Sequence, residues 1–404
     1  MYNIYLIKYS NTKTKFMRIA MIGQKGIPAI YGGIETHVEE LSAQLAKNGH
    51  EVLVYARSWY TPKKIKTYKG VRIIHTPTIR TKNLDAIVHT FISTIHALFQ
   101  KPDVIHYHGV GPALLSFIPR IFAPRVKVVA TFHCVDRYHQ KWGFIAKTML
   151  ALGEMAACAF PHETITVSKS LRDYCLNEHI CNTTYIPNGV NLPKMKKGSD
   201  FGKLNIKAGK YVLMVSRLVR HKGAHYLIAT WKKLQKKYPE ILRDYKLVIA
   251  GDSVFTDDYI DELHYLANGD KSIIFAGWVR GEKLAQLYRN CALLVHPSEN
   301  EGLPIIVLEA MSYGKATLLS DIAEHKELVT DRKFLFTNAD VDSLSQKLIA
   351  LLKNPEICKE IGAKNRQMVA RYYNWDDIVE YTENIYLRPA IVKQTEMKLK
   401  MAKV

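Results

Sequence analysis

The chain has 404 residues, which is enough for two or three domains that each bury a hydrophobic core. Its 57 Lys and Arg residues outnumber 37 Asp and Glu residues, so the formal net charge of +20 favours anionic partners: nucleic acid, a membrane surface or a phosphorylated substrate. The six cysteines form no C-x-x-C pair, no uncharged apolar stretch reaches 18 residues and no signal peptide is recognisable, which argues against zinc-ribbon, redox and membrane-spanning classes and for a cytoplasmic protein.

The first predicted element is a strand at residues 17–23, which follows a polar and basic N-terminal extension at residues 1–16. A loop with Gly32 and Gly33 comes next, and the helix after it repeats apolar side chains at helical spacing before Asn48-Gly49 ends it. The loop reads GQKGIP where a dinucleotide-binding fingerprint needs G-x-G-x-x-G, so NAD binding is disfavoured.

Short apolar strands alternate with helical patterns through the rest of the chain. In the first half, the predicted strands are residues 51–56, 71–76, 103–109, 127–133, 164–168 and 183–189. In the second half, they are residues 211–218, 246–252, 272–278, 292–298, 316–321 and 334–337. Continuous apolar strands between helices are typical of parallel sheets covered on both faces.

A break in this pattern divides the chain into two similar halves. Residues 193–209 are rich in Gly, Lys and polar side chains and are interpreted as a linker. It joins an expected N-terminal domain at residues 17–192 to an expected C-terminal domain at residues 210–371. A final helix and basic tail at residues 372–404 are expected to pack back on the N-terminal domain. The fold class predicted is α/β, with two Rossmann-like domains that face each other across a cleft lined by strand-end loops.

The segment ENEGLPIIVLE places two carboxylates eight positions apart, Glu301 in a strand-end loop and Glu309 in the following helix. Gly302 allows the backbone to approach a ligand, and Pro304 suits the first turn of a helix. Free N–H groups at such a helix start favour an anion such as a diphosphate.

Cations that could balance a diphosphate follow another predicted strand. The segment SRLVRHKG supplies Arg217, Arg220 and Lys222. An Arg can hold a phosphate through two hydrogen bonds and a Lys adds a point charge, so these residues could take the place of a metal ion.

The E-x7-E pattern, SRLVRHKG and YGGIETHVEELSAQLAKNGHEV together resemble the retaining nucleotide-sugar glycosyltransferases of family 4, also called glycosyltransferase group 1, which have the GT-B fold. The resemblance runs from about Met17 to Arg388. The Tyr31–Glu40 loop and TFHCVDRYHQKWG are similar to members that build bacterial surface polysaccharides.

This resemblance implies a role for each matching donor-site position. Arg217 and Lys222 would hold the donor diphosphate, Gly33 would approach it from the other domain, and Glu309 would bind the ribose. The backbone that would line the phosphate site is that of Gly302, Leu303 and Pro304. Members of the family keep the anomeric configuration and need no bound metal or cofactor.

The same resemblance assigns the sugar side of the site. Glu301 would contact the transferred sugar, and His133 would lie near the reacting centre as the second catalytic residue. Asp136 and His108 are candidates for contacts with the acceptor or sugar.

Each assignment has a structural alternative. The two glutamates could be a solvated loop acid and a helix-surface acid, the cations a general basic surface, His133 a core histidine and Asp136 a turn cap. His106 and His108 share one strand face and could ligate a metal, but the sequence shows no third ligand, so packing or acceptor contact is favoured. Asp340 and Asp342 resemble a metal-binding acid pair, but the amphipathic run after them favours a helix cap.

The positive charge gathers on the N-terminal half. Residues 52–84 contain eight Lys or Arg and no acid, and residues 104–135 also lack acids. An apolar, helix-like segment lies between these two stretches. Basic and apolar residues together predict docking on an anionic membrane from the cytoplasmic side, whereas nucleic acid is disfavoured because no stacking module or recognition helix accompanies the charge.

The sequence therefore predicts a retaining glycosyltransferase that uses a nucleotide-diphosphate sugar and a saccharide acceptor, lipid-linked, in surface-polysaccharide synthesis. The alternatives are a nucleotide-sugar epimerase of the same fold and a non-catalytic protein that binds membrane or nucleic acid. An epimerase would release an altered nucleotide sugar without an acceptor.

Overall fold

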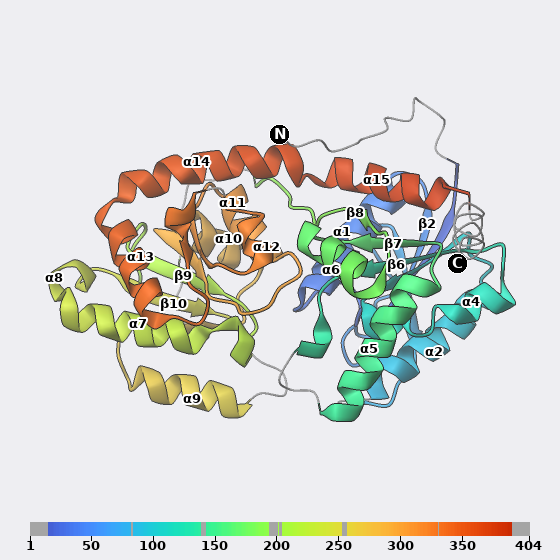
Figure 1. Cartoon of the computed structure of the whole chain (residues 1–404), viewed down its shortest axis with the longest axis horizontal. Helices are drawn as coiled ribbons and strands as arrows, with labels where there is room; N and C mark the ends of the chain where they lie inside the picture. Colours follow the sequence, from blue (N-terminus) through green and yellow to red (C-terminus); the bar gives the residue numbers. More distant parts are fainter. Residues whose placement is uncertain are drawn as a thin grey trace.

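The computed structural model describes residues 15–81, 84–138, 143–193, 201, 204–252, 257–329 and 331–389. Two α/β domains lie side by side, and two helices near the C-terminus run along both of them (Figure 1). Most of the expected extension, linker and basic tail (residues 1–14, 194–200, 202–203 and 390–404) lies outside the described residues, as do residues 139–142 of the TFHCVDRYHQKWG segment.

The N-terminal domain is built on an eight-stranded sheet in the order β3-β4-β2-β1-β5-β6-β7-β8, parallel except for β3. Its strands are β1 (Arg18–Ile22), β2 (Glu51–Arg57), β3 (Thr67–Tyr68), β4 (Val71–Thr76), β5 (Val104–His108), β6 (Lys127–Phe132), β7 (Glu163–Thr166) and β8 (Thr184–Tyr185). Its helices are α1 (Gly33–Lys47), α2 (Leu84–Phe99), α3 (Val110–Ala113), α4 (Phe117–Phe122), the 3-10 helix η1 (Asp136–Tyr138), α5 (Phe144–Ala159) and α6 (Lys169–His179).

The C-terminal domain is built on a six-stranded sheet in the order β11-β10-β9-β12-β13-β14, parallel throughout. Its strands are β9 (Tyr211–Val215), β10 (Lys246–Ala250), β11 (Ile273–Gly277), β12 (Leu293–His296), β13 (Thr317–Ser320) and β14 (Leu335–Phe336). Its helices are the 3-10 helix η2 (Arg220–Lys222), α7 (Ala224–Lys237), α8 (Pro239–Leu242), α9 (Asp257–Ala267), α10 (Gly281–Asn290), α11 (Ile305–Ser312), α12 (Ala323–Lys326), the 3-10 helix η3 (Arg332–Phe334), α13 (Val341–Lys353) and α14 (Pro355–Tyr372).

These two sheets confirm the predicted α/β fold with two parallel-sheet domains. Every predicted strand is present, and the short antiparallel β3 is the addition. Asp340 caps α13, because its Oδ1 accepts hydrogen bonds from the backbone N–H of Asp342 at 2.8 Å and of Ser343 at 3.0 Å. The helix-cap interpretation of this acid pair is thus confirmed.

The last helix, α15 (Trp375–Leu387), begins three residues later than the predicted start at Tyr372. Asn374 breaks the pattern, since its Oδ1 accepts a hydrogen bond from the N–H of Asp377 at 2.9 Å and caps α15. The helix packs on α1 of the N-terminal domain. Glu383 accepts a hydrogen bond from Asn48 at 2.8 Å, and Tyr386 lies 2.7 Å from a ring nitrogen of His106.

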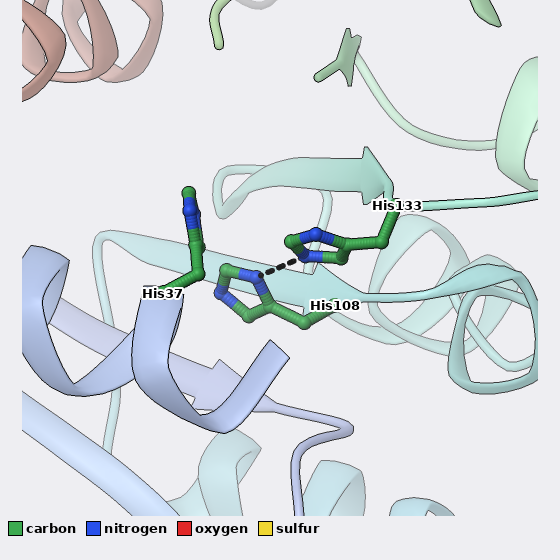
Figure 2. A group of neighbouring side chains, drawn as sticks. All are labelled: His37, His108 and His133. Carbon is green, nitrogen blue, oxygen red and sulfur yellow. Dashed lines mark hydrogen bonds between the residues drawn. The ribbon is translucent and has the colours of Figure 1, made fainter. Parts of the chain in front are cut away.

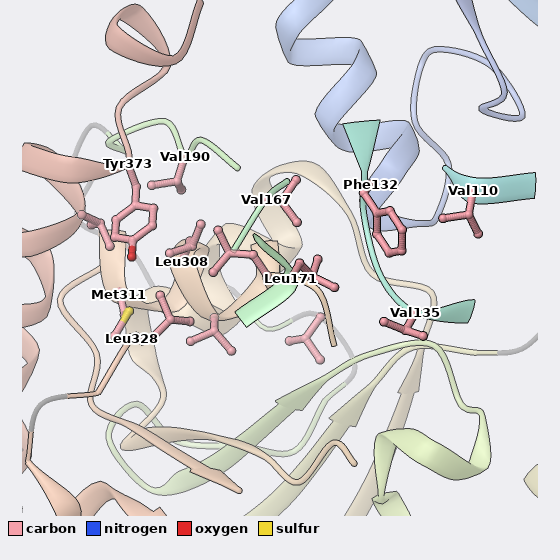
Figure 3. Packing of buried hydrophobic residues seen from close by; sticks show 14 of the residues in the cluster. Val110, Phe132, Val135, Val167, Leu171, Val190, Leu308, Met311, Leu328 and Tyr373 are labelled. Atoms are coloured by element: carbon pink, nitrogen blue, oxygen red, sulfur yellow. The ribbon is translucent and has the colours of Figure 1, made fainter. Parts of the chain in front are cut away.

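One hydrophobic cluster crosses from one domain to the other. Figure 3 shows Val167, Leu171 and Val190 of the N-terminal domain beside Leu308 and Met311 of the C-terminal domain. This packing holds the two sheets with their strand-end loops facing each other. Within the described residues, no helix has both the length and the apolar character to cross a membrane.

Candidate functional site

Each sheet has one point at which the strand order reverses. In the C-terminal sheet β9 lies between β10 and β12, and in the N-terminal sheet β1 lies between β2 and β5. The crevice outside the carboxyl ends of parallel strands at such a point is the usual ligand site of α/β sheets. The candidate residues from the sequence lie at the carboxyl ends of these strands or their neighbours, or in the loops and helices that follow them.

The two sets of loops touch at Gly302. A Cβ on this residue would lie 1.5 Å from the carbonyl oxygen of His133, so only glycine permits the contact. Two hydrogen bonds cross the domains beside it: Asn188 donates to the carbonyl oxygen of Leu303 at 2.8 Å, and Asn300 donates to that of Val135 at 3.3 Å. The site is therefore composed of residues from both domains.

Glu301 is fixed from two sides within this contact. The Lys222 ammonium forms an ion pair with Glu301 Oε1, and His296 Nε2 lies 2.6 Å from the same oxygen. Burial alone would raise the pKa of Glu301, but the charge of Lys222 and the hydrogen bond from His296 hold it well below the usual value of 4.5. Glu301 is thus an ionised acceptor, and Lys222 is already paired with it.

Arg217 is differently placed from Lys222. Its guanidinium has no hydrogen-bond or ion-pair partner among the residues that the structure describes. Burial lowers the pKa of Lys25 in the β1–α1 loop, and the positive charge of Arg217 across the cleft lowers it further. An unpaired arginine that faces a second cation favours an anion between them.

The start of α1 adds backbone donors on the same side. The N-cap residue Gly32 has φ of 106°, and no side chain caps the helix. A Cβ on Gly33 would meet no atom within 4 Å, so a ligand could approach the first turn. The N–H groups of such a turn attract phosphate.

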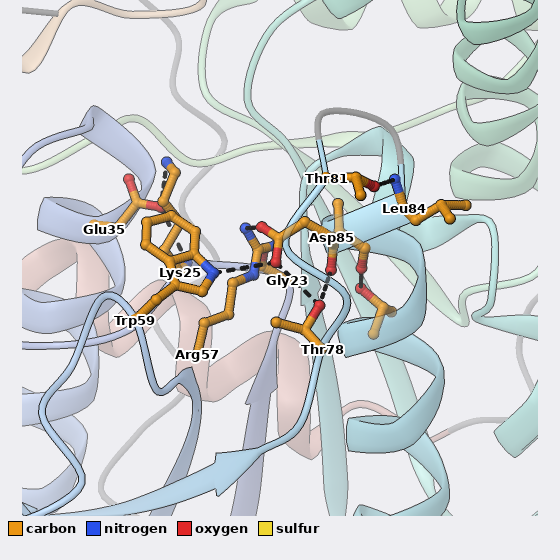
Figure 4. Close-up of polar contacts among 11 residues, drawn as sticks. Gly23, Lys25, Glu35, Arg57, Trp59, Thr78, Thr81, Leu84 and Asp85 are labelled. Carbon is orange, nitrogen blue, oxygen red and sulfur yellow. Dashed lines mark hydrogen bonds and ion pairs between the residues drawn. The ribbon is translucent and has the colours of Figure 1, made fainter. Parts of the chain in front are cut away.

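A buried charge network supports this loop, as Figure 4 shows. Lys25 Nζ lies 3.1 Å from Glu35 Oε1, and the backbone N–H of Lys25 donates to the same oxygen at 3.0 Å. Arg57 pairs with Asp85 at 2.8 Å. Lys25 and Arg57 were missed by the sequence reasoning. Their positions in the sequence could have indicated a role in the site, because Lys25 lies two residues after the first predicted strand and Arg57 lies at the end of the second.

Glu309 lines a cavity of about 320 Å³ between the domains. The cavity is lined by α1, α10 and α11 and by residues 189–193. Tyr288 donates a hydrogen bond to Glu309 Oε2 at 2.9 Å, and Tyr313 stacks on Tyr288 with ring centres 5.6 Å apart. Burial raises the pKa of Glu309 to about 7, and the nearby charge of Glu40 adds to this rise.

Three histidines converge on the N-terminal side of the contact. Figure 2 shows His37 on α1, His108 at the end of β5 and His133 just after β6. His108 Nδ1 and His133 Nε2 are 3.3 Å apart. Burial lowers the pKa of His37 to about 4 and the pKa values of His108 and His133 well below 6.5. All three rings are therefore neutral near pH 7.

Two neighbouring residues that the sequence singled out, His106 and Asp136, have different surroundings in the structure. His106 packs in the core, because its ring nitrogens lie 2.7 Å from Tyr386 Oη and from Thr131 Oγ1. Asp136 begins the 3-10 helix after β6 and accepts a hydrogen bond from Cys134 Sγ at 3.2 Å. His37 was not recognised in the sequence, where helical spacing alone could not show that it lies beside two strand-end histidines.

Comparison with known proteins follows the two-domain division. Residues 31–194 match the family model Glycosyltransferase Family 4, and residues 196–368 match the model Glycosyl transferases group 1. An uncharacterised glycosyltransferase of Methanocaldococcus jannaschii is 26% identical over 92% of this chain and 98% of its own length. Alpha-monoglucosyldiacylglycerol synthase of Streptococcus pneumoniae is 24% identical over 84% of this chain and 80% of its own length.

The fold agrees with these sequence matches. The crystal structure of Anabaena HepE in complex with UDP and glucose superposes with a TM-score of 0.73 at 20% identity, covering 91% of this chain and 98% of that chain.

Proposed function

The chain belongs to the glycosyltransferases of group 1 and family 4 with the GT-B fold, and from this premise we propose that it transfers a sugar, with retention of configuration, from a nucleotide-diphosphate sugar to a lipid-linked saccharide. The proposed setting is surface-polysaccharide synthesis. Retention is supported by the family resemblance of the sequence.

The observation that carries the donor proposal is the unpaired guanidinium of Arg217. Its charge acts on Lys25 across the cleft, beside the start of α1, which no side chain caps. A diphosphate between them would meet the Arg217 guanidinium, the Lys25 ammonium that Glu35 partly neutralises, and N–H donors of the first turn of α1. These groups would stabilise the negative charge that develops on the leaving diphosphate, which is the role a metal ion has in other transferases. We therefore propose that the donor diphosphate is held without a metal.

The remaining polar residues suit the rest of the donor. Glu301 would accept hydrogen bonds from sugar hydroxyls, because it is ionised and held by Lys222 and His296. Glu309 would accept from the ribose hydroxyls in the cavity between the domains. His133 would lie beside the reacting sugar, at the position where the domains touch and exclude water.

The acceptor proposal rests on an exposed apolar face of the N-terminal domain. Phe99 of α2, Phe122 of α4 and Phe144 of α5 are 78%, 73% and 86% exposed, and Ile121 and Ile145 are exposed beside them. Helix α2 contacts α3 and α4, and α3 contacts α5, so these helices lie together on one side of the domain (Figure 1). Phe99 and Phe122 are the last residues of α2 and α4, and Phe144 is the first residue of α5. Exposed apolar patches of this kind mark interaction surfaces.

Charge indicates an anionic membrane as the occupant of this face. Lys101, Arg125 and Lys147 are exposed on or beside these helices. Helices α2 and α5 each contain one carboxylate, and neither is free on the surface. Asp85 of α2 pairs with Arg57, and Glu154 of α5 is buried. The sequence predicted that the membrane-docking residues lie in residues 52–84 and 104–135 and in the helix between them. In the structure, several of the most exposed apolar side chains belong to α5 instead.

Vesicle binding tests this face. The wild-type protein is expected to co-sediment with anionic vesicles and much less with neutral ones, and a Phe144→Ser, Ile145→Ser double variant is expected to bind at least tenfold more weakly. A matched Tyr265→Ser variant changes an 84% exposed aromatic residue of α9 on the other domain and should bind as wild type does. Equal binding to both kinds of vesicle would exclude the membrane proposal.

Transfer itself is tested with radiolabelled nucleotide sugars and a bacterial lipid extract. The expected result is label in the organic phase only when protein, donor and extract are all present, with the donor's anomeric configuration kept in the product by NMR. An altered nucleotide sugar without any acceptor would show the epimerase alternative instead, and inversion would refute retention.

A further inference from the structure

His37, His108 and His133 present ring nitrogens that all lie within 4.8 Å of one another. The closest pair, His108 Nδ1 and His133 Nε2, is 3.3 Å apart. A tetrahedral zinc ion with Zn–N bonds of about 2.0–2.1 Å holds its nitrogen ligands about 3.3 Å apart. One pair already has this separation, and the third nitrogen, within 4.8 Å of the other two, requires a side-chain movement of at most about 1.5 Å to reach it.

One weak contact accompanies these rings. The side chains of His37 and Asn188 are close enough to interact, but His37 Nδ1 and Asn188 Oδ1 are buried and form no well-aligned hydrogen bond among the described residues. Because this contact is weak, little hydrogen-bond energy opposes the binding of an ion by His37. His106, in contrast, has both ring nitrogens satisfied and is not available as a fourth ligand.

The ligand set selects the class of ion. Three neutral imidazoles without a carboxylate suit Zn²⁺ and its transition-metal neighbours, while Mg²⁺ and Ca²⁺ require oxygen ligands. Known zinc sites also include ones in which three histidines bind the ion and a water molecule or substrate takes the fourth position.

A second cluster, His296, Glu301 and His325, has comparable spacing. In that cluster the Lys222 ammonium already forms an ion pair with the Glu301 carboxylate, and its positive charge repels a metal ion. The histidine cluster of the N-terminal domain has no such cation in contact with it among the described residues.

We propose that His37, His108 and His133 form a binding site for a single Zn²⁺-class transition-metal ion, separate from the metal-free diphosphate site. A bound ion would hold the ring of His133 away from the sugar, so Zn²⁺ would inhibit transfer reversibly. This second statement rests on the proposed role of His133, whereas the metal site itself does not.

Cobalt titration of the chelator-treated full-length protein tests the site without any substrate. Co²⁺ is expected to bind in a one-to-one ratio with the intense visible absorption of tetrahedral nitrogen coordination, and Zn²⁺ should displace it. His37→Ala and His108→Ala are expected to weaken Co²⁺ binding more than tenfold, since even loss of a residue that only supports a ligand reduces affinity 10–100-fold.

Two control variants separate this cluster from other histidines. His325→Gln alters the second cluster, and His264→Ala removes an exposed histidine of α9; both should bind Co²⁺ as wild type does. His37→Gln replaces His37→Ala if circular dichroism shows that the alanine variant does not fold. The proposal is overturned if no tetrahedral spectrum appears, or if His325→Gln rather than the His37 variant abolishes it.

Zinc inhibition is measured separately. Micromolar Zn²⁺ should reduce transfer, millimolar Mg²⁺ should not, and chelator should restore it. Co²⁺ binding without zinc inhibition would keep the metal site and reject the role of His133, while inhibition that persists in His37→Ala would place the inhibitory zinc elsewhere.

Discussion

Replacement of Glu309 by Gln should stabilise the protein and weaken nucleotide binding at the same time. The carboxylate lies in the cavity between the domains, where burial raises its pKa from 4.5 to about 7. Glu309 therefore binds its proton more tightly in the folded protein than in the unfolded chain. Stability is fully retained below about pH 4.5, falls as the pH rises toward 7, and stays reduced above pH 7.

The magnitude follows from the size of this pKa shift. A rise from 4.5 to about 7 corresponds to at most about 3.5 kcal/mol at about 1.4 kcal/mol per pKa unit. Gln cannot ionise, and its amide oxygen can still accept the hydrogen bond that Tyr288 donates at 2.9 Å. The gain in free energy of unfolding should therefore be about 1 kcal/mol at pH 5 and about 3 kcal/mol at pH 8.

Urea unfolding of wild type and Glu309→Gln at both pH values measures this difference. Nucleoside diphosphate affinity, measured on the same samples at pH 8, should fall in the variant because the ionised acceptor for the ribose is lost. An equal gain at pH 5 and pH 8, or a variant less stable than wild type, would refute the assigned environment of Glu309.

Three further substitutions test other parts of the account. Gly302→Ala should reduce transfer at least tenfold, because the new Cβ would overlap the carbonyl oxygen of His133 and force the domains apart; small-angle scattering should show a larger radius of gyration. Lys25→Gln should weaken diphosphate binding at least tenfold in calorimetry, whereas Lys233→Gln, which changes an exposed lysine of α7 that pairs with Asp342, should not. Trp375→Ala should lower the free energy of unfolding by about 3–5 kcal/mol, since this buried ring fills the space beside Gly189 between α15 and the N-terminal domain.

The fold could be predicted in large part because parallel strands carry a strong local signal. Residues 211–215 and 292–295 are apolar at every position, which only strands covered on both faces tolerate. The start of α15 was placed wrongly because Tyr372 and Tyr373 suit a helix, and only the hydrogen bond from Asp377 to Asn374 shows where the new helix begins.

The site was harder to predict because its partners are far apart in the sequence. Strand-end position identified Arg217 and Glu301 as cleft residues, but not that Lys222 would pair with Glu301 instead of remaining free. The convergence of His37 with His108 and His133 depends on how α1 crosses the ends of β5 and β6. Spacing along the chain carries no information on such contacts.

Calorimetric titration with UDP, GDP, ADP and dTDP, with and without chelator, tests whether a metal-free diphosphate site surrounds Arg217. We expect that at least one nucleotide binds, that chelator leaves its affinity unchanged, and that Arg217→Ala abolishes binding. The control Arg220→Ala, whose exposed side chain pairs with Glu262, should bind as wild type does. Failure of all four nucleotides to bind, or binding that survives in Arg217→Ala, would contradict the account.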